Sequence, residues 1–62
     1  MTPRDKAIKL LNEAGYEFKG HGAKHDKYYN PVLHQTIPLK RHAVTENTVS
    51  YIKKEIEKNA RA

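Results

Sequence analysis

The sequence predicts a small α+β fold of the order α-β-β-β-α, in which two helices cover one face of a three-stranded antiparallel sheet. Three observations predict it. Apolar residues recur at helical spacing near both ends of the chain, apolar and polar residues alternate between these segments, and Gly or Pro marks the boundaries. At 62 residues, the chain is expected to form a single domain, residues 1–62.

The first helix is expected in the segment "TPRDKAIKLLNEAG", where both ends carry signals. Thr2 is suited to cap the helix, Pro3 suits its first position, and Asp5 completes a capping-box pattern. Gly15 supplies the left-handed residue that closes a helix. The apolar stripe of this helix consists of Ala7, Leu11 and Ala14, flanked by Ile8 and Leu10.

The first strand is expected in "YEFKGH", where apolar and polar residues alternate. Tyr16 and Phe18 would face the core and the residues between them would face solvent, as in a half-buried strand. Gly20 and Gly22 then indicate a turn or a bulge.

The second and third strands are expected in "KHDKYY" and "HQTIPL", joined by the turn "NPVL". Proline has no N–H to give to a sheet ladder. The third strand is therefore expected to lie at an edge of the sheet or to end at Pro38.

The second helix is expected to begin at Thr45, after the basic loop "KRHAV". Its apolar stripe consists of Val49, Ile52 and Ile56. The tail "KNARA" carries no further apolar stripe residue, and we expect it to fray.

The chain is strongly basic. Twelve Lys and Arg residues against seven Asp and Glu give a net charge of +5 and an isoelectric point near 9.6. Positive charge at this density attracts polyanions, and nucleic acid is the commonest of these in cytoplasm. The alternative, that the charge only keeps a small domain in solution, stays open at this point.

Several classes of protein are disfavoured by what the sequence lacks. Without cysteine there is neither a disulfide framework nor a thiolate zinc site. The segment "MTPRDKAIKLL" lacks the apolar run of a signal peptide, and no stretch approaches the ~20 apolar residues of a membrane span. A cytoplasmic protein without a membrane partner is expected.

The segment "GHGAKHDKYYNP" carries the chemistry that a small fold does not need. A histidine side chain transfers protons near neutral pH, and RNA supplies its own nucleophile, the 2′-hydroxyl. His25 is thus a candidate catalyst, with Lys24 and Lys27 on the phosphate. If Tyr28 lies in the core, alternation along the strand places His25, Lys27 and Tyr29 on the outer face, where Tyr29 is suited to stack on a base. The simpler alternative is that His25 only faces water.

Two further features concern binding. Lys40 and Arg41, with His42, precede the expected second helix and are suited to contact phosphate near a helix N-terminus. His21 and His25 are four residues apart, but Gly22 disfavours a helix that would aim both at one metal ion. We expect no metal and no small-molecule cofactor.

Together these segments resemble the HicA family, the toxin half of a bacterial toxin–antitoxin pair. The resemblance covers roughly residues 3–56. It consists of "KLLNEAGYEF" for the helix end, "AKHDKYYNP" for the histidine strand with its Pro turn, and "IPLKRHAVTENTVSYIKKEI" for the last strand, basic loop and helix.

The resemblance implies a fold similar to double-stranded-RNA-binding domains and a metal-independent endoribonuclease that cleaves mRNA. It also implies one catalytic histidine, His25, and neutralisation by a HicB-like antitoxin. Two positions depart from the family pattern: Lys24 replaces a small residue, and Asp26 replaces a second histidine. A carboxylate beside His25 is expected either to orient its ring or to repel phosphate. The alternatives are a non-catalytic RNA-binding module of the same fold and a small interaction subunit.

Overall fold

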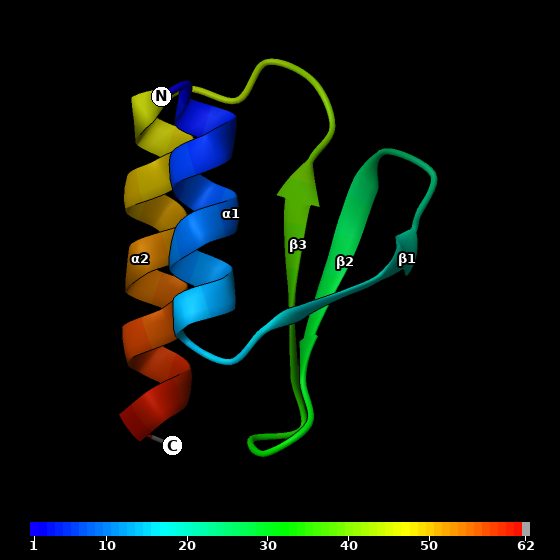
Figure 1. Ribbon diagram of the computed structural model, residues 1–62, viewed down its shortest axis with the longest axis vertical. Coiled ribbons are helices and arrows are strands. Elements are labelled where there is room, and N and C mark those ends of the chain that lie inside the picture. The colour runs from blue at the N-terminus through cyan, green and yellow to red at the C-terminus, as the bar shows by residue number, and fades with distance from the viewer. Residues whose placement is uncertain (62) are drawn as a thin grey trace.

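The computed structural model describes residues 1–61 and has the predicted order of elements, α-β-β-β-α (Figure 1). The elements are α1 (Pro3–Glu13), β1 (Glu17–His21), β2 (His25–Asn30), β3 (Gln35–Lys40) and α2 (Glu46–Arg61). The three strands form one antiparallel sheet in the order β1-β2-β3. Neither helix, over the residues that the structure describes, has the length and apolar character needed to cross a bilayer.

Both ends of α1 lie where the sequence predicts them. The Thr2 hydroxyl accepts a hydrogen bond from the backbone N–H of Asp5 at 3.1 Å, and Pro3 occupies the first turn. At the other end Gly15 has a φ of 92°. The N–H of Tyr16 then reaches the carbonyl of Leu11 at 2.8 Å, and the N–H of Gly15 donates to Asn12. This is the Schellman arrangement that ends many helices.

Helix α2 begins as predicted but extends further. The Thr48 hydroxyl accepts a hydrogen bond from the N–H of Thr45 at 3.3 Å, which is one half of a capping box. For residues 58–61 of the tail, the expectation of fraying is wrong, because the helix continues to Arg61; Ala62 lies outside the described residues. Asn59 donates to the hydroxyl of Tyr16 at 3.0 Å, and Tyr16 is buried. This contact ties the last turn of α2 to the core.

Strand β1 is more exposed than the alternation predicts. Phe18 pairs with Tyr28, so it does lie on the inner face of the sheet, yet 51% of it is exposed. The physical reason is that the buried core gathers on β2, β3 and the helices, which leaves the β1 edge uncovered. Phe18 packs edge-on against Tyr28 instead, with ring centroids 5.8 Å apart. The predicted irregularity is a bulge at Lys19, since Phe18 and Gly20 face consecutive residues of β2.

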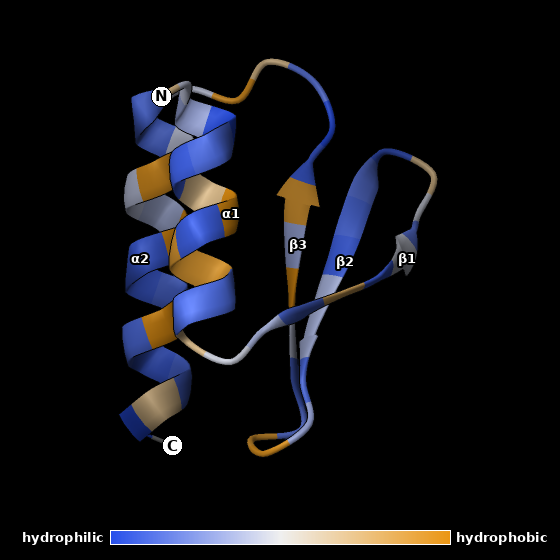
Figure 2. Ribbon diagram, in the orientation of Figure 1, coloured by the Kyte–Doolittle hydropathy of each residue, from blue (hydrophilic) through white to orange (hydrophobic). Residues whose placement is uncertain are grey.

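The core lies between the inner face of the sheet and the two helices (Figure 2). Its buried apolar residues are Ala7, Leu11, Tyr16, Tyr28, Ile37, Leu39 and Ile52. Burial raises the pKa of the Tyr28 hydroxyl above its ordinary value. Strand β3 is an edge strand, as Pro38 predicts.

The two helices lie side by side and begin at the same end of the molecule (Figure 1). The start of β2, the end of β3 and the loop that enters α2 lie at that end as well (Figure 1). Segments far apart in the sequence therefore meet there, and the residues singled out by the sequence lie mostly among them.

Asn30 holds the opposite end of the sheet. Its buried side chain donates to the carbonyl of Ala14 at 3.1 Å and accepts hydrogen bonds from the N–H groups of Val32 and Leu33 at 2.9 and 3.0 Å. One side chain thus fixes both the end of α1 and the β2–β3 turn.

Replacing Asn30 with alanine is expected to lower the free energy of unfolding by about 2–3 kcal/mol, because three backbone groups lose a partner. Urea denaturation followed by circular dichroism measures this. The matched control is Asn12→Ala on the exposed side of α1, which should change the free energy by less than about 0.5 kcal/mol. Equal effects of the two substitutions would contradict this role of Asn30.

Candidate nucleic-acid interface

The outer face of β2 carries the residues predicted for it. Asp26, Tyr28 and Asn30 are buried, whereas His25 and Lys27 are exposed and Tyr29 is half-buried. The predicted alternation is therefore confirmed. The register pairs His25 with Lys40 and Lys27 with Pro38 across the ladder. Directly paired residues share a face, so the side chains of His25 and Lys40 leave the sheet on the same side.

The turn between β1 and β2 fixes the backbone of His25. The N–H of Gly22 donates to the carbonyl of His25 at 2.7 Å. A Cβ atom at Gly22 would lie 2.8 Å from that same oxygen and 3.6 Å from Cε of Lys27. Only glycine allows this approach, and the Lys27 side chain lies along the turn.

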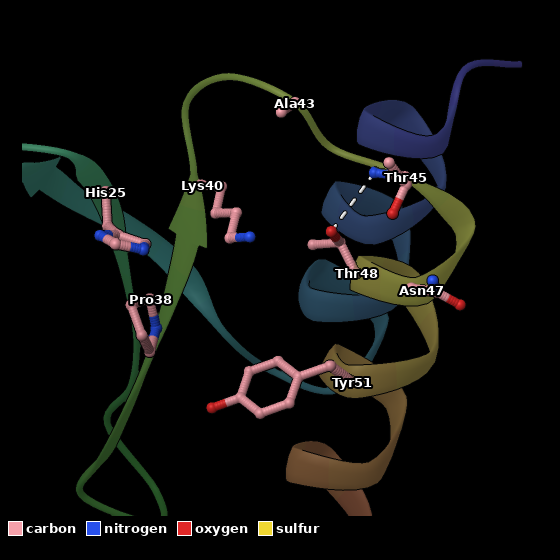
Figure 3. A pocket seen from close by; sticks show the side chains of 8 residues that line it. All are labelled: His25, Pro38, Lys40, Ala43, Thr45, Asn47, Thr48 and Tyr51. Carbon is pink, nitrogen blue, oxygen red and sulfur yellow. Dashed lines mark hydrogen bonds between the residues drawn. The ribbon is translucent and has the colours of Figure 1, made fainter.

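A cleft of about 570 Å³ opens between β3 and α2, and the sheet residues that line it belong to the outer face (Figure 3). The lining residues are His25, Pro38, Lys40, Ala43, Thr45, Asn47, Thr48 and Tyr51. The ring of Tyr51 extends from α2 toward β3 in this view. Ala43 has a φ of 56°, a left-handed conformation that is unfavourable for alanine, and it lies in the loop that closes this end of the cleft.

A second hollow, of about 440 Å³, adjoins the first at His25 and Lys40, which line both. Its other lining residues are Ala23, Lys24, Arg41 and His42. No carboxylate lines either hollow in the part of the chain that the structure describes. Four of the predicted site residues, Lys24, His25, Lys40 and Arg41, thus lie together.

Asp26 lies on the opposite face of β2 from His25, and 3% of its side chain is exposed. Its carboxylate accepts hydrogen bonds from Nδ1 of His21 at 2.7 Å and from Nη2 of Arg4 at 2.8 Å. Nε of Arg41 lies 3.3 Å from Oδ1. Asp26 therefore does not orient the ring of His25, because the strand alternation aims the two side chains in opposite directions.

The Asp26 cluster, defined as Asp26 with Arg4, His21 and Arg41, reaches the outer face indirectly. Nη1 of Arg4 donates to the carbonyl of Lys40 at 2.9 Å, which holds the end of β3. Nη1 of Arg41 lies 3.5 Å from the carbonyl of Gly22. The hydrogen bonds from His21 and then Arg4 hold the pKa of Asp26 below its ordinary value.

Tyr29 lies away from both hollows. It is four residues from His25, which is roughly 13 Å along a strand. Its hydroxyl is hydrogen-bonded to Nδ1 of His34 at 3.1 Å, and Nζ of Lys19 lies 5.5 Å from its ring centroid. Stacking of a base on Tyr29 stays a prediction, and it would concern a nucleotide some distance from His25.

The sequence reasoning missed the α2 side of the cleft, above all Tyr51. A signal was available, because Tyr51 is an aromatic residue outside the apolar stripe of an amphipathic helix. The position of Ala43 in the wall of the cleft could not be predicted, since nothing in an alanine side chain indicates a left-handed backbone.

His21 and His25 lie on opposite faces of the sheet. His21 pairs with Asp26 and so lies on the inner face, whereas His25 points outward. Among residues 1–61, no group of three or more His, Asp or Glu side chains has the geometry to hold a metal ion.

Comparison of the chain with models of protein families, with curated proteins and with solved structures finds no match.

The Asp26 cluster makes the free energy of unfolding depend on pH in the acidic range. In the unfolded chain Asp26 has its ordinary pKa of 3.8, and in the folded protein its pKa is lower. The unfolded state therefore binds more protons between these two values, so the contribution is present above the unfolded pKa and is lost as pH falls through the folded one.

We expect the urea midpoint of Asp26→Asn to lie below that of the wild type at neutral pH and to change less as pH falls from about 5. The matched control is Asp5→Asn, at the only other aspartate, which is exposed. This control should show the acid dependence of the wild type. Parallel curves for the wild type and Asp26→Asn would contradict the role of the cluster.

Proposed function

We propose that this protein is a metal-independent endoribonuclease that cleaves mRNA, with His25 as its catalytic residue. The observation that carries the proposal is the position of His25, exposed opposite Lys40 where two hollows meet that no carboxylate of residues 1–61 lines. A polyanion can approach an imidazole there without meeting a like charge.

The reaction uses the nucleophile that RNA itself provides. His25 takes the proton of a 2′-hydroxyl, and the 2′-oxygen then forms a bond to the adjacent phosphorus. The bond from phosphorus to the 5′-oxygen breaks, and that oxygen receives a proton from the imidazolium or from water. The products are a 2′,3′-cyclic phosphate and a 5′-hydroxyl end.

The cations around His25 support the charge that develops on phosphate. Lys40 is its cross-strand partner, and Lys24 lies in the turn directly before it. Lysine places a compact positive charge near the phosphoryl oxygens and so stabilises the transition state more than the substrate. Lys27 extends the basic surface along β2. Arg41 is less available to bind phosphate than the lysines, because its guanidinium already contacts Asp26 and Gly22.

The biological role rests on the resemblance to the HicA family. On that basis the chain is the toxin of a cytoplasmic toxin–antitoxin pair, and a HicB-like antitoxin neutralises it by covering the outer face of the sheet. That face carries the exposed His25, Lys27 and Lys40, which suits an acidic protein surface.

The substitution His25→Ala is expected to slow cleavage of a mixed-sequence, single-stranded RNA by a factor of about 100 or more, the range for general acid–base catalysis. Gel analysis of end-labelled RNA in excess EDTA measures the rate. His25 is exposed, so circular dichroism should show an unchanged fold.

The matched control is His34→Asn, which removes an imidazole at the β2–β3 turn, suits the φ of 55° there and should retain cleavage. If neither the wild type nor His25→Ala cleaves RNA but both bind it with strong salt dependence, the protein is instead a non-catalytic RNA-binding module. Equal cleavage by both proteins would overturn the role of His25.

Expression of the wild-type chain alone is expected to arrest bacterial growth, whereas His25→Ala expressed to the same level should not. Colony counts after induction measure this. Co-expression of the product of a neighbouring gene should restore growth. Harmless expression of a protein that cleaves RNA in vitro would contradict the toxin role and leave the enzyme activity standing.

A further inference from the structure

We infer that the cleft between β3 and α2 binds the base of one unpaired nucleotide of single-stranded RNA, next to the phosphate held at His25 and Lys40. The inference rests on the proposed function, because it concerns the same surface and adds which form of RNA binds there and where its base lies. Tyr51 is the residue that carries the base.

Tyr51 is not part of the buried core. It is 51% exposed, while the stripe of α2 that faces the core consists of Val49, Ile52 and Ile56. Within residues 1–61, the ring–ring contacts all involve Phe18, and no hydrogen bond of the Tyr51 hydroxyl is present. An aromatic ring that lines a cleft without a partner is suited to stack on a flat ligand.

The other walls of the cleft suit a nucleobase. Pro38 offers an apolar ring on the outer face of β3, in the direction toward which Tyr51 extends (Figure 3). Thr48 on α2 brings a hydroxyl to the cleft, and a hydroxyl can both donate and accept hydrogen bonds at a base edge. The cleft volume of about 570 Å³ lies in the range of small-molecule sites.

The adjoining hollow provides the second half of the ligand. A nucleotide joins a flat aromatic base to a phosphate, and the two hollows join an aromatic cleft to a basic surface. His25 and Lys40 line both, so a phosphate at this junction would adjoin the base on Tyr51 and the backbone beyond it on Lys24. The charges of the site and of the ligand are complementary, because no carboxylate lines either hollow in the described chain.

This arrangement selects single-stranded over double-stranded RNA. A base inside a duplex is stacked and paired, and it must leave the helix to reach a cleft in a protein. An unpaired base is free to enter. Duplex RNA that is recognised by its shape would contact the lysines through its phosphates, and its bases would not reach Tyr51.

The test measures binding in the His25→Ala background, where RNA stays intact, using the full chain and an eight-nucleotide single-stranded RNA of mixed sequence. Adding Tyr51→Ala is expected to weaken binding roughly 5- to 150-fold, the range that stacking on one aromatic ring gives. Tyr51→Phe keeps the ring and should keep the affinity. The matched control is Phe18→Ala, which removes an aromatic side chain of the same 51% exposure from β1 and should not weaken binding.

An abasic oligonucleotide of the same length separates the base from the phosphates. Its weaker binding should be insensitive to Tyr51→Ala. Equal loss of affinity for the abasic and the normal strand would overturn the inference, as would equally tight binding of a duplex of the same sequence.

The outcomes also separate this inference from the proposed enzyme. If Tyr51→Ala binds and cleaves RNA like the wild type while His25→Ala is inactive, the enzyme stands and the base pocket is overturned. If no variant cleaves RNA but Tyr51→Ala selectively loses the single strand, the base pocket is supported and the catalytic proposal fails.

Discussion

The paired charge of Asp26 is the constraint on which the rest of the molecule depends. A buried carboxylate is costly unless other groups compensate its charge. Arg4 on α1, His21 on β1 and Arg41 in the loop before α2 all contact it. One side chain of β2 therefore connects the first helix, the neighbouring strand and the loop that leads to the second helix. Because residues 1–61 include only seven buried apolar side chains, such a network helps to select one arrangement of the elements.

The same constraint creates the outer surface. When Asp26 and Tyr28 point inward, His25 and Lys27 must point outward, because successive side chains of a strand alternate. The bond from Arg4 to the carbonyl of Lys40 then holds the end of β3 beside His25. Neighbouring residues of β2 thus have opposite environments: Asp26 is buried and its charge is compensated within the fold, whereas His25 faces solvent.

The sequence predicted those features that local rules determine. The helix ends follow from Thr2, Gly15 and Thr45, and the face of His25 follows from strand alternation once Tyr28 is taken as core. Features that depend on distant partners were not predictable. The last turn of α2 is held by a contact from Asn59 to a residue 43 positions earlier, and the partners of Asp26 come from three other segments. The exposure of β1 depends on how far the helices reach across the sheet, which no local pattern specifies.

Two acidic residues at this end of the molecule are each paired with basic side chains. Asp26 is held by two arginines, and Glu46, at the start of α2, pairs with Lys6 at 3.1 Å. Both acidic residues are thus paired and neither lines a hollow, whereas Lys24 and Lys40 do. A net charge of +5 alone would attract any polyanion weakly and without orientation. In the proposed function, the paired acids and the lysines that line the hollows orient that attraction toward His25 and Tyr51.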